Sequence, residues 1–273
     1  MQEKEPSIPI DEEFLARMER AFTGWDDPVR RLMRALDGNE LQLFMQPIAN
    51  LGGHQFVMAE VLVRLSEEGA GLLPPGQFLP VFEQYDMTPA LDRWVVNRLT
   101  RRIAQAAPGG LRHFNINVGG ATLKDQGFPE HVARTLREFG VPAHTLCFEI
   151  NESHVLSELS AATRFGAAVR SLGCRVAIDG FGRRAATFAP LASLRVDFIK
   201  VDGSITRHLL SSDSAVNKMQ TIVRVGQAIK VGVIAEFVED ADVLARLISL
   251  GVDYAQGFGV ARPAPIDDLL KSE

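Results

Sequence analysis

Seven apolar segments of this chain are each interrupted by one carboxylate, amide or amine side chain. A carboxylate buried in such a segment is costly unless it is paired or bound to a metal ion. Carboxylate and amide oxygens are the ligands that Mg²⁺ and Mn²⁺ prefer, so the set suits a hard divalent cation. The six histidines fall mostly near turns and helix starts, which argues against a histidine-based zinc site. The seven residues are Glu60, Asn117, Glu149, Asp179, Lys200, Glu236 and Gln256.

Each of these residues also has an ordinary structural explanation. Any one carboxylate could pair in the core with a lysine or with the amides at a strand end. Asn117 alone is typical of a turn or cap, Lys200 of a side chain whose charged end reaches solvent, and Gln256 of a strand-end turn. If each of the seven had a separate structural role, the chain would have to bury many polar groups independently, each at a cost in free energy. Their joint occurrence therefore favours one shared site.

The polar residues lie inside or at the end of apolar, β-rich segments that alternate with longer segments of helical spacing. This alternation is typical of a parallel sheet, and eight strands are the number that closes a barrel. In such barrels, active sites assemble from the carboxyl ends of several strands. The predicted strands are 41–48, 56–65, 112–118, 146–150, 175–179, 197–201, 232–238 and 252–258.

Helices are predicted between most of these strands, at about 77–106, 129–139, 154–172, 206–230 and 241–250, with a short one near 185–193. Only "ANLGGHQ" separates the first two strands, and this is too short for a helical crossover. We therefore expect these two strands to be antiparallel. The predicted fold class is α/β, a TIM-like (β/α)8 barrel with one antiparallel strand.

The length of 273 residues, with 46% hydrophobic residues, suits one large domain. Residues 1–27 are expected to form a linker that includes a short helix from residue 11, "DEEFLARMERAF". The domain is expected over 28–268, followed by a tail at 269–273.

Charge and cysteine content restrict the partners and the compartment. The net charge of −5 offers no basic field for long nucleic acid, although a pocket for a few phosphates is compatible with it. No stretch is long and apolar enough to enter a membrane. Cys147 and Cys174 lie in apolar runs without CxxC spacing, which indicates buried, reduced thiols and a cytoplasmic location.

Longer motifs resemble one known family. The stretches "LQLFMQPIANL", "AEVLVRL", "NINVGGATL", "CFEINES", "AIDGFG", "LRVDFIKVDGSI", "VIAEFVED" and "GVDYAQGF" followed by "RPAP" are similar to the EAL domain, the bacterial phosphodiesterase module that handles cyclic di-GMP. The resemblance covers residues 28–268 in motif order. It also implies a TIM-like barrel with an antiparallel strand.

The resemblance implies a role for each aligned residue, with Mg²⁺ or Mn²⁺ as the cofactor. Two such ions would clamp the attacking and leaving oxygens of the phosphodiester, and Asp179 would bridge them. By this resemblance, Glu60, Asn117, Glu149 and Asp179 are metal ligands, Lys200, Glu236 and Gln256 position or activate water, and Gln46 and Arg64 contact the ligand.

The chain departs from the family at the second metal. The family usually has two adjacent aspartates before Phe-Gly, whereas this chain has Gly180 at the second of them. The loop that follows usually reads Thr-Gly-Tyr-Ser-Ser, and here it reads "RRAAT". Lesser departures are "EVL" for Glu-Ala-Leu and Gly119 for a serine. One metal site, or none, is therefore expected in place of two.

These departures favour a cyclic di-GMP-binding receptor with little or no hydrolysis. The alternatives are an active phosphodiesterase that yields linear pGpG, and a protein-interaction module without nucleotide. By resemblance, the expected partners are an upstream sensory or GGDEF-type domain, a second copy of the chain, or an effector protein.

Overall fold

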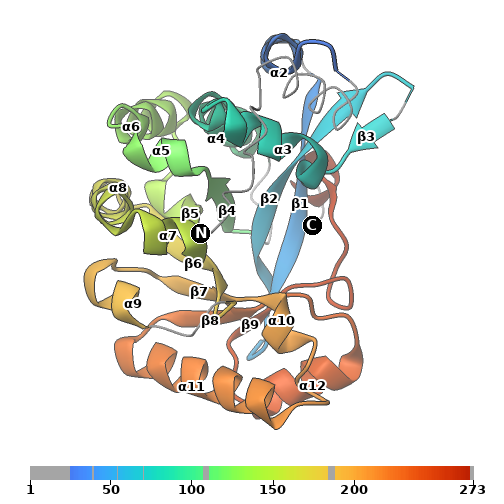
Figure 1. Ribbon diagram of the computed structural model, residues 1–273, viewed down its shortest axis with the longest axis vertical. Helices are drawn as coiled ribbons and strands as arrows, with labels where there is room; N and C mark the ends of the chain where they lie inside the picture. The colour runs from blue at the N-terminus through green and yellow to red at the C-terminus, as the bar shows by residue number, and fades with distance from the viewer. Residues whose placement is uncertain are drawn as a thin grey trace, which may run out of the picture.

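The computed structural model describes residues 25–38, 40–53, 55–69, 71–106, 111–183 and 188–270. In these residues, eight strands close into a barrel in the order β1-β9-β8-β7-β6-β5-β4-β2, and β2 pairs again with β1 (Figure 1). This confirms the predicted fold class. The strands are β1 Leu41–Asn50, β2 Gln55–Glu67, β4 His113–Val118, β5 Leu146–Asn151, β6 Arg175–Phe181, β7 Phe198–Val201, β8 Gly232–Ala235 and β9 Tyr254–Ala255, with β3 Gly71–Leu73 and β10 Ala264–Pro265 at the sides.

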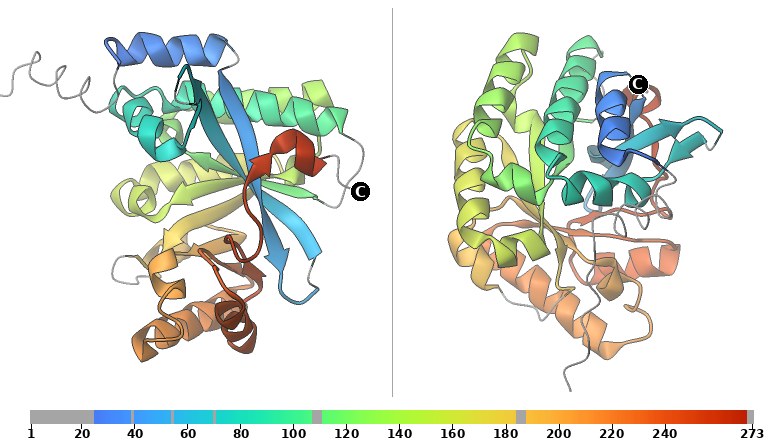
Figure 2. Two further views of the ribbon diagram at one scale, coloured as in Figure 1. Left: turned by 90° about the vertical axis from the view of Figure 1, so that its right-hand side faces the viewer. Right: turned by 45° about the horizontal axis from the view of Figure 1, so that its top comes forward.

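The strand β1 is antiparallel to both of its barrel neighbours, β2 and β9, as predicted for the first strand pair. The remaining pairs around the barrel, from β2 through β4 to β9, are parallel. Figure 2 shows the two long strands β1 and β2, in blue, crossing the side of the barrel. Seven strands therefore open their carboxyl ends toward the same mouth, where their polar residues can meet.

Three predicted helices are shorter or interrupted. The segment 77–106 forms two helices because Asp86 between them has the left-handed angle φ = 51° and ends the first. The segment 154–172 breaks at Glu158. The segment 206–230 begins its long helix only after Ser212, whose hydroxyl accepts from the amide of Ala215. The helices are α3 Pro75–Gln84, α4 Thr88–Gln105, α7 Glu152–Ser157, α8 Leu159–Ser171, α10 Gly203–Thr206 and α11 Asp213–Ile229.

Two strand predictions extended too far along the chain. The segment 232–238 is a strand only through Ala235, and 252–258 only over Tyr254–Ala255. The remaining helices lie before the first barrel strand or after later strands, and the short one near 185–193 appears as α9. These are α2 Pro28–Asp37, α5 Gly120–Lys124, α6 Phe128–Phe139, η1 Ala143–Thr145, α9 Ala189–Ser193, α12 Ala241–Ser249 and α13 Ile266–Leu270.

The layer between barrel and helices is packed with aromatic rings. Phe148 of β5 contacts Phe128 of α6 and Phe165 of α8 edge to face, each at 5.9 Å between centroids. Burying one such ring contributes about 1.5–3 kcal/mol. Cys147 and Cys174 are buried and free, and burial raises the pKa of Cys174 to about 12. In the described part of the chain, every helix is too short or too polar to span a bilayer.

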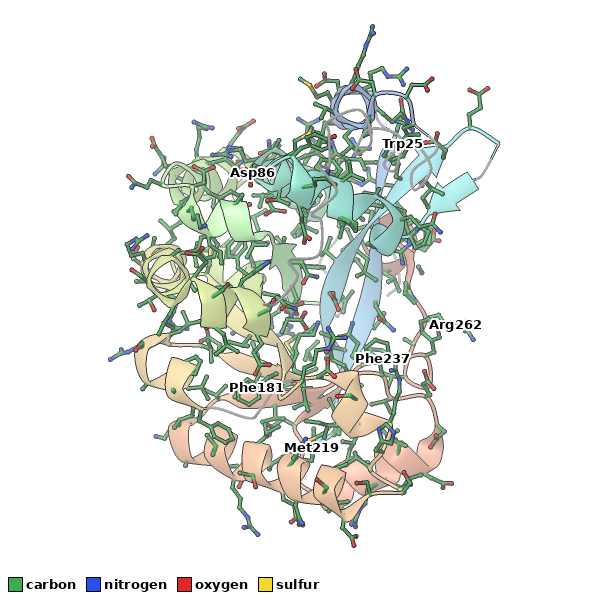
Figure 3. All side chains as sticks on the ribbon, in the orientation of Figure 1. Trp25, Asp86, Phe181, Met219, Phe237 and Arg262 are labelled. Atoms are coloured by element: carbon green, nitrogen blue, oxygen red, sulfur yellow. The ribbon has the colours of Figure 1, made fainter. Side chains whose placement is uncertain are left out.

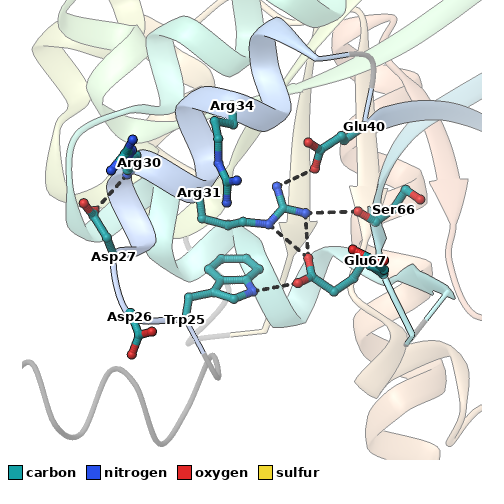
Figure 4. Close-up of a pocket in the computed structure, with 10 residues that line it drawn as sticks. Trp25, Asp26, Asp27, Arg30, Arg31, Arg34, Glu40, Ser66 and Glu67 are labelled. Carbon is teal, nitrogen blue, oxygen red and sulfur yellow. Dashed lines mark hydrogen bonds and ion pairs between the residues drawn. The ribbon is translucent and has the colours of Figure 1, made fainter.

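Trp25 packs the first described residues against α2 and the end of β2. Its indole donates to Glu67, and Arg31 donates to the same carboxylate at 2.6 Å while lying over the indole ring (Figure 4). These residues line a polar pocket of about 770 Å³ against α2. The helix expected from residue 11 lies outside the described residues.

Candidate functional site

The centre of the predicted site is the ammonium group of Lys200, on β7. The side chain is 1% exposed, and four carboxylates surround its nitrogen. Its Nζ lies 2.9 Å from Glu60, 2.9 Å from Glu149, 3.2 Å from Glu236 and 3.6 Å from Asp179. In the same order, the four come from β2, β5, the end of β8 and β6, so barrel closure brings them together from distant parts of the sequence.

Glu60 is held by amide groups as well as by Lys200. Asn117 donates to its Oε1 at 2.7 Å, and Gln256 donates to its Oε2 at 2.7 Å. Gln256 also contacts Gln46, which pairs directly with Glu60 across β1 and β2. All seven polar residues predicted from the strand ends therefore meet in one network, and Gln46 joins it.

Opposing effects set the ionisation of Glu60 and Lys200. Burial alone would raise the pKa of Glu60, but the charge of Lys200 and the three donated hydrogen bonds lower it. Burial would likewise lower the pKa of Lys200, but the surrounding carboxylates raise it well above its usual value. These two groups therefore carry opposite charges at neutral pH.

The other two buried carboxylates behave differently. Burial raises the pKa of Glu149 well above its usual value, and the charges of Glu60 and Asp179 add to the effect while Lys200 opposes it. Burial raises the pKa of Glu236 to about 8 against the same opposition from Lys200. Glu236 can therefore hold a proton near neutral pH, and both raised pKa values limit the negative charge at the centre.

Arg64 lies apart from this network. It follows Glu60 by four residues on β2, so both side chains face the same side of the strand. Its guanidinium donates to the carbonyl of Val63 and lies over the ring of Phe44 at 5.4 Å from the centroid. Within the described residues it has no ion pair, which leaves its charge available to an anion at the mouth.

The oxygen donors fit one hard cation in chemistry, although Lys200 now occupies their centre. No cluster of three or more His, Cys, Asp or Glu side chains in the described ranges is arranged to hold a metal ion. The donors of the predicted first site nevertheless converge: Glu60, Glu149 and Asp179 surround one point, and Asn117 touches Glu60. Carboxylate and amide oxygens are the ligands that Mg²⁺ requires.

The predicted second position does not fit a cation. Gly180 has φ = 67°, and a β-carbon placed there would have Asn151 Nδ2 at 3.5 Å and Asp202 Oδ2 at 3.9 Å as its nearest neighbours. The Nε of Arg183 lies 3.4 Å from the same oxygen of Asp202. An amide N–H therefore faces the place of the missing carboxylate, and the carboxylate that lies beside it, Asp202, is already paired with a guanidinium. The rest of the altered loop, residues 184–187, lies outside the described part of the chain.

Sequence reasoning missed three residues of the site. Asn115 donates to Glu149 at 2.7 Å in the buried interior, and its position two residues before Asn117 on one strand was a usable signal. Asn151 stands two residues after Glu149 on β5, so a period of two would have found Asn115 and Asn151. Asp202 lies just beyond β7, as the N-cap of α10, and the strand period does not reach it.

The mouth opens into a cavity of about 510 Å³ between the strand ends and helices α3 and α4. Glu60, Asn117, Asn151 and Asp179 line one side of it, and Asp92 lines the other. Phe237, directly after Glu236, is 48% exposed against α10 (Figure 3). Arg207 lies 4.1 Å from the centroid of this ring.

Known proteins are similar to this chain in both sequence and fold. The chain is similar to the Xanthomonas citri FimX EAL domain, solved in complex with c-diGMP (TM-score 0.83, 30% identity, 96% of this chain and 99% of that chain). It is also similar to the FimX EAL domain from Pseudomonas aeruginosa bound to c-di-GMP (TM-score 0.81, 28% identity, 87% and 96%).

The cyclic di-GMP phosphodiesterase PdeF of Escherichia coli is 32% identical over 243 residues, which are 89% of this chain and 32% of that protein. The chain spans about a third of the length of PdeF and of other curated relatives that it matches. The EAL domain family model matches residues 29–263. The chain therefore belongs to the EAL domain family.

Proposed function

We propose that this domain binds cyclic di-GMP at the carboxyl mouth of its barrel and hydrolyses it slowly or not at all, acting as a receptor. The observation that carries the proposal is Gly180, which leaves the second cation position without its carboxylate. The FimX domains bound to c-di-GMP support the ligand, since they share the fold and nearly a third of the sequence.

The ligand would lie across the mouth with its phosphates toward the cationic side chains. Arg64 would contact one phosphate, because its guanidinium forms no ion pair among the described residues and lies on the face of β2 that carries Glu60. Gln46 would fix the edge of the site through Gln256.

We propose that Mg²⁺ or Mn²⁺ would be held, where one binds, by Glu60, Asn117, Glu149 and Asp179. Such an ion supplies charge neutralisation at a phosphate and activates water. Lys200, Glu236 and Gln256 would orient that water, since each lies within hydrogen-bond distance of another member of the network. Without the second cation, the leaving oxygen would lack part of its stabilisation, and hydrolysis would be slow.

A competent phosphodiesterase that yields linear pGpG is the second candidate. The observation in its favour is that all seven strand-end groups form one network, as a working centre requires. Asp202 also approaches the place of the missing carboxylate. A module that binds only protein is the third candidate, and it predicts no response to nucleotide.

Calorimetry with cyclic di-GMP and a turnover assay with Mg²⁺ or Mn²⁺ separate these candidates. A receptor binds the ligand and turns it over very slowly, and Arg64→Ala weakens binding by about 1.5–3 kcal/mol. Rapid metal-dependent hydrolysis that disappears in Glu60→Ala would establish the phosphodiesterase. Indifference to micromolar ligand would leave the protein-interaction module.

We further propose that residues 28–268 act as the output module of a longer cytoplasmic protein with an upstream sensory or GGDEF-type domain. This proposal is supported by the relatives themselves, since the matched region is only about a third of their length. A second copy of the chain or an effector protein would receive the signal. Limited proteolysis should remove residues before Trp25 and leave a stable core. Cleavage within the barrel at an equal rate would contradict the predicted domain bounds.

A further inference from the structure

We propose that Asn151 and Arg183 form a metal-independent subsite for a phosphodiester oxygen at the position beside Gly180. The inference rests on the proposed function, because the ligand is the phosphodiester that the mouth is proposed to bind. It concerns what replaces the second cation, which the residues there do not fit.

The orientation of the Asn151 amide is fixed by its own helix. Its Oδ1 accepts from the backbone amide of Ser153 at 3.0 Å and from the hydroxyl of Ser153 at 2.6 Å. Both interactions require an acceptor, so the oxygen is committed and Nδ2 is the end that faces Gly180, at 3.5 Å from its β-carbon position. An N–H donor stands where the family has an acceptor carboxylate.

Arg183 adds a positive charge to the same place. Its Nε lies 3.4 Å from Asp202 Oδ2, so it neutralises the carboxylate left near Gly180. The side chain is 74% exposed, and the pairing uses only one of its five N–H groups, so it can turn toward the mouth. Relative to the family pattern, Gly180 removes one negative charge and Arg183, in place of threonine, adds one positive charge.

These two changes favour an anion over a cation. A divalent cation at this point would face the N–H group of Asn151, and the nearby carboxylate of Asp202 is already neutralised by Arg183. A phosphate oxygen would accept from Nδ2 of Asn151 and from the guanidinium, which binds phosphate in a planar fork. Asn151 and Asp179 line the cavity at the mouth, so an oxygen in that cavity can reach the subsite.

The test is the affinity for cyclic di-GMP, by calorimetry on the whole chain, in EDTA and in millimolar Mg²⁺. The wild-type chain should already bind in EDTA, and any further gain in Mg²⁺ would come from the first cation site, which the subsite does not replace. Arg183→Ala should weaken binding in EDTA by about tenfold, and Arg183→Lys should recover part of the loss because it keeps the charge. Mg²⁺ should partly rescue Arg183→Ala, since Asp202 is then free, whereas a merely structural role would give no such rescue.

Asn151→Asp is the matched variant for the amide. Aspartate keeps the acceptor that caps α7, so folding is preserved, but it replaces the donor with a negative charge. Binding in EDTA should fall by at least about tenfold, and thermal unfolding checks that the fold is intact.

The outcomes separate the two levels of the proposal. A wild-type chain that binds no ligand in either buffer overturns the proposed function itself. Binding that requires Mg²⁺ leaves the receptor function standing and overturns the metal-independent subsite. Binding in EDTA that is unchanged in Arg183→Ala also overturns the subsite, and this variant remains decisive because an exposed arginine is not needed for folding.

Discussion

Replacing Gly180 with aspartate tests the charge balance of the second position directly. The backbone there has φ = 67°, and a residue with a β-carbon in that conformation costs about 1–2 kcal/mol, less for aspartate and asparagine. Space is not limiting, because the nearest atoms to the new β-carbon are at 3.5 and 3.9 Å, which are ordinary contacts. The Gly180→Asp variant should therefore fold with a modest loss.

A second loss comes from repulsion between carboxylates. The new group would stand near Asp202 and next to Asp179, and two charges about 5 Å apart repel by about 1–3 kcal/mol at an effective dielectric between 80 and 20. Gly180→Asn has the same shape and the same backbone cost without the charge. We expect it to be more stable than Gly180→Asp in buffer without divalent ions, by the amount of this repulsion.

Divalent cations should reverse that difference. A cation that binds only the folded variant, present at ten times its dissociation constant, stabilises it by about 1.4 kcal/mol. Urea unfolding with MgCl₂, compared with NaCl at equal ionic strength, should show this gain in Gly180→Asp beyond any gain in wild type or Gly180→Asn. The gain should be largest when Arg183→Ala is added. An equal Mg²⁺ response in all variants would refute the reasoning.

Three further changes test the barrel and its charges. Burial raises the pKa of Asp92 from 3.8 to about 7, so the folded chain keeps a proton that the unfolded chain releases. The free energy of unfolding should therefore fall as the pH rises from about 4 to 7, by about 4 kcal/mol at most. Asp92→Asn should remove this slope in urea unfolding at the two pH values; an unchanged slope contradicts it. Lys200→Met leaves the buried carboxylates without their cation and should cost about 3–5 kcal/mol at pH 7, less at pH 5 where they protonate. The same cost at both pH values would contradict this explanation. Arg31→Met should cost about 1.5–3 kcal/mol and alter the fluorescence of Trp25, and a spectrum like that of wild type would count against the clamp on Glu67.

The barrel could be predicted from the sequence because its signals are local. Apolar runs separated by helical segments give a strand count, and a connection of seven residues, "ANLGGHQ", forces an antiparallel pair. Helix interruptions are less visible. Asp86 separates α3 from α4 by a left-handed backbone angle, which an aspartate in a sequence does not by itself predict. Pro89 in the first turn of α4 is the local signal that a second helix begins there.

The membership of the site could be predicted, but its arrangement could not. Each polar residue interrupts an apolar run and so reveals itself, whereas the position of Lys200 between four carboxylates depends on barrel closure. Glu236 and Gln256 were placed inside strands and lie just beyond them, because β8 and β9 end early. Asn151 and Asp202 were missed because an asparagine or aspartate at a strand end is usually only a helix cap, and both residues are caps as well.

The charges at the centre determine what the mouth can accept. Lys200 contributes one positive charge against four carboxylates, so the ionised set carries a net charge of −3 (1 − 4). The raised pKa values of Glu149 and Glu236 allow protons to reduce it, but the set remains unfavourable for a phosphodiester anion. A positive charge must therefore accompany the ligand. In an enzyme, metal ions supply it at the reacting oxygens. In the proposed receptor, Arg64 and Arg183 would supply it beside them, where charge would hold the ligand without stabilising the oxygen that must leave, and binding would be separated from hydrolysis.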